Sequence, residues 1–219
     1  MTRRPMLLAA IALAAAATLS LSACGSDETS KGKDNDKIAG VDTGSEVSAS
    51  PSASASATDD RPKIALPSDV TYKFEWTKTG NADKDAVLND AEQRIKAVDL
   101  AIAEQDPLHT AYRFYSEGTA AAGSQSYIQE FVDHKARTTG LTRYYNEDLT
   151  VNSDNTAAFL YCEDQSKAYN KFLETGKTDI TPVTKDSYVM YASTLRKNKN
   201  GVWVTETLDS QRGSEKCQP

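Results

Sequence analysis

The 219-residue sequence has few histidine and cysteine residues and no aromatic residue in its first 71 positions. Its 2 Trp, 10 Tyr and 5 Phe all lie from Tyr72 onward. With 3 Cys and 2 His, the chain has too few ligands for most structural zinc sites. The spacings typical of zinc proteases, serine hydrolases, phosphate-binding loops and EF-hands are also missing. We therefore expect no metal and no cofactor.

A basic cluster is also missing, because 25 Lys and Arg are spread among 31 Asp and Glu, for a net charge of −6. Nucleic-acid binding depends on grouped Lys and Arg that neutralise phosphates, so we expect no nucleic-acid partner. The hydrophobic content of 39% is too low for a membrane channel or transporter.

Acidic residues are missing from residues 1–23, where Arg3 and Arg4 precede an apolar run and then Leu21-Ser22-Ala23-Cys24. A basic start, a short apolar run and small residues before a cleavage point are typical of an export signal. The stretch is also just long enough for an uncleaved membrane anchor, which stays an alternative.

The Leu-Ser-Ala-Cys tetrad resembles the lipobox of bacterial lipoproteins. The resemblance implies that Cys24 is linked to diacylglycerol and becomes the new N-terminus, carrying fatty acyl chains such as palmitate. Two acyl chains hold a protein stably on a bilayer, whereas one does so only marginally. We expect the mature protein to be extracytoplasmic, anchored to the outer face of the cell membrane, with the membrane as its partner through this lipid.

Residues 24–66 are predicted to join this anchor to the folded part as a tether. They are mostly small and polar, with an alternating Ser/Ala tract at residues 48–57. Such a composition buries too little apolar surface to offset chain entropy, so we expect disorder. Within it, the 37 residues from Gly25 to Arg61 would have a root-mean-square end-to-end distance of about 30–37 Å as a flexible coil.

Residues 67–219 are predicted to form one domain in which helices precede strands. Apolar residues repeat at helical spacing in the first half, and alternate along the second half with turn residues between. This order predicts an α+β fold with N-terminal helices packed on one face of a curved antiparallel sheet. Tyr72, Phe74 and Trp76 indicate a strand or an apolar strap. The expected helices cover 83–105, 108–115 and 120–135, and the expected strands 141–151, 156–163, 186–197 and 202–211.

This order of elements resembles the cone-shaped, nuclear-transport-factor-two-like fold. The chain also resembles small secreted lipoproteins of actinobacteria, a family of unknown function, so this resemblance implies fold and location but no activity. The residues that carry it, besides the lipobox and tether, are Gly140–Tyr145, Tyr161-Cys162, Pro182–Val189 and Ser210–Gly213 leading to Cys217.

Once lipid occupies Cys24, only Cys162 and Cys217 remain, so one intramolecular disulfide is possible. Exported proteins meet an oxidising environment that favours this bond. The two residues are too far apart in sequence to resemble a redox-active Cys-x-x-Cys pair. We therefore expect a structural disulfide.

The strand tyrosines are the best candidates for a site, and we expect Tyr144, Tyr161, Tyr188 and Tyr191 at the mouth of a pocket. Side chains alternate along a strand, so Tyr188 and Tyr191 cannot both face inward without a bulge, and Tyr144 and Tyr145 point to opposite faces. We expect His109 and His134 to be solvated. We expect the same of the acids near strand ends, namely Asp148, Asp154, Glu163 and Asp164.

These features favour a non-enzymatic binding module of the cell envelope, whose partner is a small apolar ligand or an envelope protein. The alternative is a small enzyme of isomerase or dehydratase type, in which a Tyr hydroxyl and a buried acid act inside the cone. An acid beside a Tyr hydroxyl in a hollow interior would favour the enzyme, whereas a filled interior would favour protein binding.

The anchor generates the first prediction. Replacing Cys24 with alanine should abolish lipid attachment and release the protein from membranes, because the two acyl chains have no other attachment point. Mass spectrometry of the mature N-terminus checks this. A wild-type N-terminus at another residue, without acyl mass, would contradict the lipobox.

Overall fold

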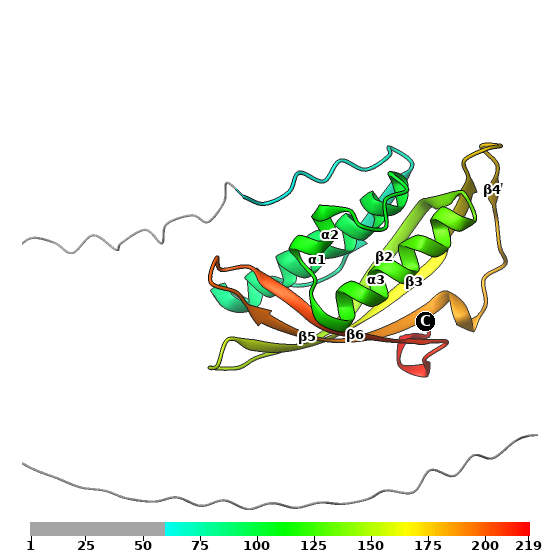
Figure 1. The fold of residues 1–219 in the computed structure, drawn as a ribbon. Helices are drawn as coiled ribbons and strands as arrows, with labels where there is room; N and C mark the ends of the chain where they lie inside the picture. The colour runs from blue at the N-terminus through cyan, green and yellow to red at the C-terminus, as the bar shows by residue number, and fades with distance from the viewer. Residues whose placement is uncertain (1–59) are drawn as a thin grey trace, which may run out of the picture. The chain divides into compact units, whose positions relative to one another are not determined.

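The computed structural model describes residues 60–219. The predicted signal peptide, Cys24 and most of the predicted tether lie outside the described residues. Within the described part, no helix is both long and apolar enough to cross a membrane. Figure 1 shows helices gathered on one side and long strands on the other, which confirms the α+β class and the predicted order of elements.

Three helices follow the short strand β1 (Val70–Phe74): α1 (Ala82–Ala103), α2 (Thr110–Phe114) and α3 (Gly118–Asp133). The predicted cap of α1 is present, since the Asn81 side chain accepts hydrogen bonds from the backbone N–H groups of Asp83 and Lys84. These bonds satisfy N–H groups that the first turn leaves without helical partners. Helix α1 then buries one apolar face, including Val87, Ala91 and Ile95, against the sheet.

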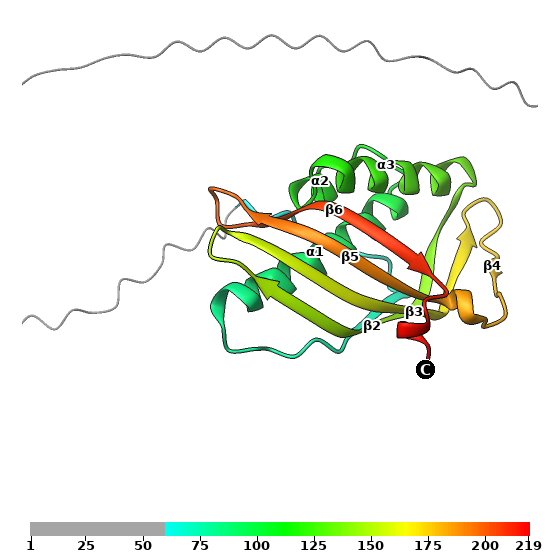
Figure 2. The same cartoon turned by 90° about the horizontal axis from the view of Figure 1, so that it is seen from below.

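The sheet follows the order β1-β2-β3-β5-β6, with the two-residue β4 paired to β3. Strand β1 runs parallel to β2, which the sequence did not indicate, and the other pairs are antiparallel. Figure 2 views the sheet from its outer side, with α1 behind the strands and α2 and α3 visible beyond the β6 edge. The later elements are β2 (Ala136–Val151), β3 (Thr156–Phe172), β4 (Thr178–Asp179), β5 (Tyr188–Lys197) and β6 (Trp203–Arg212), with short 3₁₀ turns η1 (Lys185–Ser187) and η2 (Glu215–Cys217).

Strands β2 and β3 extend beyond the ranges expected from the sequence, because their paired ends are polar and carry no hydrophobic alternation. Strand β2 begins at Ala136 rather than at residue 141, and β3 continues to Phe172 rather than 163. Gly140 allows this close pairing: its φ is +92°, and a Cβ there would lie 2.2 Å from the Lys167 carbonyl oxygen. Only glycine meets both conditions without strain.

A buried carboxylate joins the start of the domain to α1 and β6. The Asp90 carboxylate accepts a 2.8 Å hydrogen bond from the Trp203 backbone N–H and pairs with the Arg61 guanidinium. Ile64 and Leu66, which precede the boundary expected at residue 67, pack on the core between α1, α2 and α3. The chain is therefore fastened to the domain from Arg61 onward.

The outer face of the sheet carries the predicted disulfide. Cys162 and Cys217 are bonded, with Cα atoms 5.5 Å apart, which confirms the pairing. Tyr145 lies opposite Cys162 in the register and donates its hydroxyl hydrogen bond to the Cys217 carbonyl oxygen. Tyr188 and Met190 pack around this group. The C-terminal segment is thus held against β3 and β5.

Replacing either Cys162 or Cys217 with serine should lower the free energy of unfolding by about 2–5 kcal/mol, since the bond restricts the unfolded chain. Urea unfolding of each variant measures this, and wild type in reductant should match the variants. Unchanged unfolding midpoints would contradict a stabilising role.

Candidate functional site

A cavity of about 450 Å³ lies between α1, α3 and the inner face of the sheet. Its walls combine apolar side chains with charged groups and tyrosine hydroxyls. The lining residues are Arg94, Ile95, Val98 and Asp99 from α1; Thr119, Ala120, Gly123, Ser124, Tyr127 and Phe131 from α3; Thr138, Thr142 and Tyr144 from β2; Tyr161, Glu163, Gln165, Ala168, Tyr169 and Asn170 from β3; and Tyr191, Leu208, Ser210 and Arg212 from β5 and β6.

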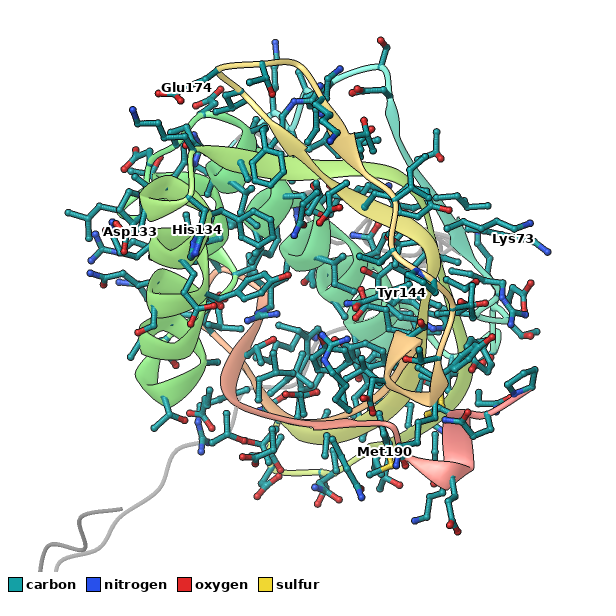
Figure 3. All side chains as sticks on the ribbon, turned by 90° about the vertical axis from the view of Figure 1, so that its right-hand side faces the viewer. Lys73, Asp133, His134, Tyr144, Glu174 and Met190 are labelled. Atoms are coloured by element: carbon teal, nitrogen blue, oxygen red, sulfur yellow. A yellow bond between two sulfur atoms is a disulfide. The ribbon has the colours of Figure 1, made fainter. Side chains whose placement is uncertain are left out.

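Three of the four predicted pocket tyrosines line this cavity together. Tyr144 and Tyr161 are almost fully buried, and the Tyr191 ring stacks on that of Tyr161 with centroids 5.1 Å apart. Tyr188 instead packs on the outer face with the disulfide. Figure 3 shows Tyr144 on the inner side of the sheet and Met190, two residues after Tyr188, toward its outside.

Glu163 is the carboxyl group at the centre of these rings, and the sequence-based expectation of a solvated strand-end acid is wrong for it. Strand β3 continues past this residue, which leaves Glu163 only 7% exposed and places it on the cavity side with Tyr161. Its carboxyl accepts hydrogen bonds of 2.9 Å from the Tyr144 hydroxyl and 2.9 Å from the Gln165 side-chain amide.

Burial raises the pKa of Glu163, and the nearby charge of Asp99 raises it further, against the opposite effect of the hydrogen bonds from Tyr144, Tyr191 and Gln165. The same burial, with the charge of Glu163, raises the pKa values of Tyr144 and Tyr191 well above the ordinary phenol range. The cavity therefore favours neutral forms of its acids and phenols.

A second carboxyl group, Asp99, lies on the α1 wall. It accepts hydrogen bonds from the hydroxyls of Tyr72 and Thr138, the latter at 2.9 Å. Removal from bulk water raises its pKa, while these two hydrogen bonds lower it. Asp99 links β1, α1 and β2, so it supports the wall as well as contributing polarity.

A buried cation, Arg94, faces the same space from one turn earlier on α1. Its Nε donates to the Ser116 hydroxyl oxygen at 2.9 Å and its Nη2 to that of Ser124 at 2.7 Å. The residue is 5% exposed, and burial lowers its pKa. The cavity thus carries one buried cationic group and two carboxyl groups with raised pKa values.

Arg94, Asp99 and Glu163 were not selected as site residues from the sequence. Glu163 could have been found by parity, because it lies two residues after Tyr161 on a strand. Arg94 is next to Ile95 in the sequence and Asp99 is next to Val98, and both neighbours belong to the apolar face of the helix. This adjacency was the sequence signal that Arg94 and Asp99 lie near the core. Which of them meet across the cavity depends on how α1 packs on the sheet.

The histidines lie outside this site. His109 caps α2 by accepting from the Ala111 N–H at 3.0 Å and contacts Glu104 at 2.9 Å. His134 ends α3, where its ring contacts the Glu130 carbonyl oxygen. Among residues 60–219, no group of three or more His, Cys, Asp or Glu is arranged to hold a metal ion.

A second hollow, of about 570 Å³, adjoins the cavity near the segment that joins β4 to β5. The two share Tyr127, Phe131, Gln165, Tyr169 and Arg212 among their lining residues. Arg212 donates to the Gln165 side-chain oxygen and to the Asp186 carbonyl oxygen, so it braces this end. The cavity therefore extends toward the β4 end of the domain.

No protein-family model and no curated protein matches the chain. Similar solved structures include a ketosteroid isomerase-like protein from Erwinia carotovora, with 12% identity and a TM-score of 0.41 over 61% of this chain and 98% of that one. A hexachlorocyclohexane dehydrochlorinase from Novosphingobium barchaimii is 11% identical, with a TM-score of 0.39 over 59% of this chain and 88% of that one. The intermembrane space region of chloroplast protein ARC6 is 14% identical, with a TM-score of 0.41 over 60% of this chain and 98% of that one. At these identities and TM-scores, the likenesses do not bear on what this chain does.

Glu163 generates a prediction about pH. Its raised pKa means that the folded state holds this proton more tightly than the unfolded state, whose Glu pKa is about 4.3. Its contribution to stability is therefore lost as pH rises from that value through the folded pKa. Replacing Glu163 with glutamine should remove this loss, so the variant should gain stability relative to wild type as pH rises from about 4 to 7.

Urea unfolding at several pH values measures this difference. Glu174→Gln is the control, because a hydrogen bond from Lys135 lowers the pKa of Glu174, and the sign of its effect is opposite. A Glu163→Gln difference that stays constant over this pH range would contradict a raised pKa in the folded protein.

Proposed function

We propose that the protein is a lipid-anchored binding module outside the cytoplasm that holds one small, largely apolar molecule in the cavity between α1, α3 and the sheet. The observation that carries this proposal is the cavity itself. Its volume of about 450 Å³ falls within the range of about 300–1,000 Å³ typical of small-molecule sites. Anchoring through Cys24 rests on the sequence pattern alone.

The composition of the walls supports a ligand with a large apolar part. Ile95, Val98, Phe131 and Leu208 supply apolar surface, and the tyrosine rings add flat faces. A few convergent polar groups among apolar walls fix the orientation of small ligands in proteins. An interior with this much space favours a small molecule over a protein partner, which would bind the outside of a filled domain.

A second candidate, an enzyme of isomerase or dehydratase type, is favoured by the Tyr144 hydroxyl 2.9 Å from the Glu163 carboxyl inside the cavity. A buried carboxylate can abstract a proton, and a phenol can stabilise the developing oxyanion. Tyr144 already donates to Glu163, so another phenol of the cavity walls, such as that of Tyr161, would have to take this role.

We rank binding first because the cavity supports it directly, whereas the enzyme would need a phenol other than Tyr144, which is bonded to Glu163. The two functions differ in one observable. A bound ligand is recovered unchanged from a binding protein, whereas an isomerase or dehydratase returns a molecule of altered structure.

A substitution that fills the cavity tests the proposed function. Gly123 lines the cavity from α3, and a Cβ there would meet no atom within 4 Å. Gly123→Phe should fill the space without weakening the helix, since phenylalanine has a higher helix propensity than glycine. The neutral fluorescent probe N-phenyl-1-naphthylamine should bind full-length wild type and lose at least about tenfold in affinity for this variant.

Ala122→Phe is the matched control, because its neighbouring position on α3 is exposed and outside the cavity. It should bind the probe like wild type. Circular dichroism and thermal unfolding establish that both variants fold. No probe binding by wild type, or equal binding by Gly123→Phe, would contradict the pocket.

A further inference from the structure

Arg94 is a buried cation with no anionic partner among the described residues. Only two of its N–H groups have partners, the Ser116 and Ser124 hydroxyls, both neutral. It forms no salt bridge within residues 60–219, and no carboxylate contributes to the shift of its pKa. The other N–H groups of its guanidinium are left for a molecule in the cavity that Arg94 lines.

Both nearby carboxyl groups are bound elsewhere. Glu163 is held by Tyr144 and Gln165, and Asp99 by Tyr72 and Thr138. Burying a charge is costly unless it is paired and hydrogen-bonded. Such a cost persists at positions where binding requires the charge, at the expense of stability. The unpaired guanidinium therefore points to an anion that comes from outside the chain.

We propose that Arg94 binds the carboxylate of an amphipathic organic acid whose apolar body occupies the rest of the cavity. The inference rests on the proposed function and names its ligand class. The planar guanidinium fork matches the two oxygens of a carboxylate. Ser116 and Ser124 hold the guanidinium by accepting from Nε and Nη2, which leaves both N–H groups of Nη1 and the second of Nη2 for the two carboxylate oxygens.

A carboxylate fits this cavity better than a phosphate does. A phosphate monoester brings nearly two negative charges at neutral pH. One guanidinium balances a single negative charge, so the second charge of a phosphate would be buried without a partner. The carboxyl of a monovalent acid meets Arg94 without that penalty, and its apolar part meets Ile95 and Val98 on the same helix.

Three probes of one shape test the inference on the full-length protein. They are 2-naphthoate, the neutral 2-naphthamide and 2-naphthyl phosphate, each titrated by calorimetry and by displacement of N-phenyl-1-naphthylamine. The acid should bind at least about tenfold more tightly than the amide, because only the acid forms an ion pair with the guanidinium. It should also bind more tightly than the phosphate.

Arg94→Met keeps the unbranched apolar stem of the side chain and removes the guanidinium with its charge. The variant should lose the preference for the acid, with at least about tenfold weaker 2-naphthoate binding and a much smaller change in 2-naphthamide binding. It should be at least as thermally stable as wild type without ligand, since the unpaired charge is gone. Arg113→Met is the control, because Arg113 is exposed on α2 and should change neither affinity.

The comparison of probes on wild type does not depend on how well the variant folds. Equal affinity for acid and amide, tighter binding of the phosphate, or a preference for acid that survives in Arg94→Met would each overturn the assignment of a carboxylate. So would failure of 2-naphthoate to bind. The neutral probe and Gly123→Phe test the pocket separately, so the pocket can stand where the carboxylate fails.

Discussion

The alternation of side chains along β2, β3 and β5 is the constraint on which the rest of the structure depends. Tyr161 and Glu163 turn toward the helices, while Cys162 between them turns to the outer face. The register carries this division across the sheet by pairing Tyr161 with Tyr191 and Cys162 with Met190. A slip of one residue would exchange the two faces and place the disulfide where the cavity is.

The walls of the cavity carry buried ionisable groups that lower the stability of the fold. Arg94, Asp99 and Glu163 are held by neutral hydrogen-bond partners, and none is paired with an opposite charge among the described residues. A core filled with aliphatic side chains would be more stable, as replacing buried charges by apolar groups often shows. Three buried ionisable groups around one cavity are typical of a functional site, because such sites keep residues that stability alone would not favour.

The sequence predicted the order of elements because the helical and alternating periods are strong in residues 83–135 and 141–211. It did not indicate the ends of β2 and β3, whose residues are polar and are held by pairing and by Gly140. The tyrosines were found by residue type, and parity anticipated the separation of Tyr144 from Tyr145. The convergence of Arg94 and Glu163 on one cavity depends on packing between a helix and a sheet, which no local pattern encodes.

The fastening of Arg61 to Asp90 decides where any upstream chain leaves the domain. Arg61 sits at the end marked by Trp203 and the β5–β6 turn, whereas the cavity extends toward β4, and Figures 1 and 2 both place β4 at the opposite end. The Arg61–Asp90 pair and the hollow that adjoins the cavity near β4 thus lie at opposite ends of the domain. Under the proposed function, a ligand that enters near β4 would do so at the end of the domain opposite to the Arg61–Asp90 pair.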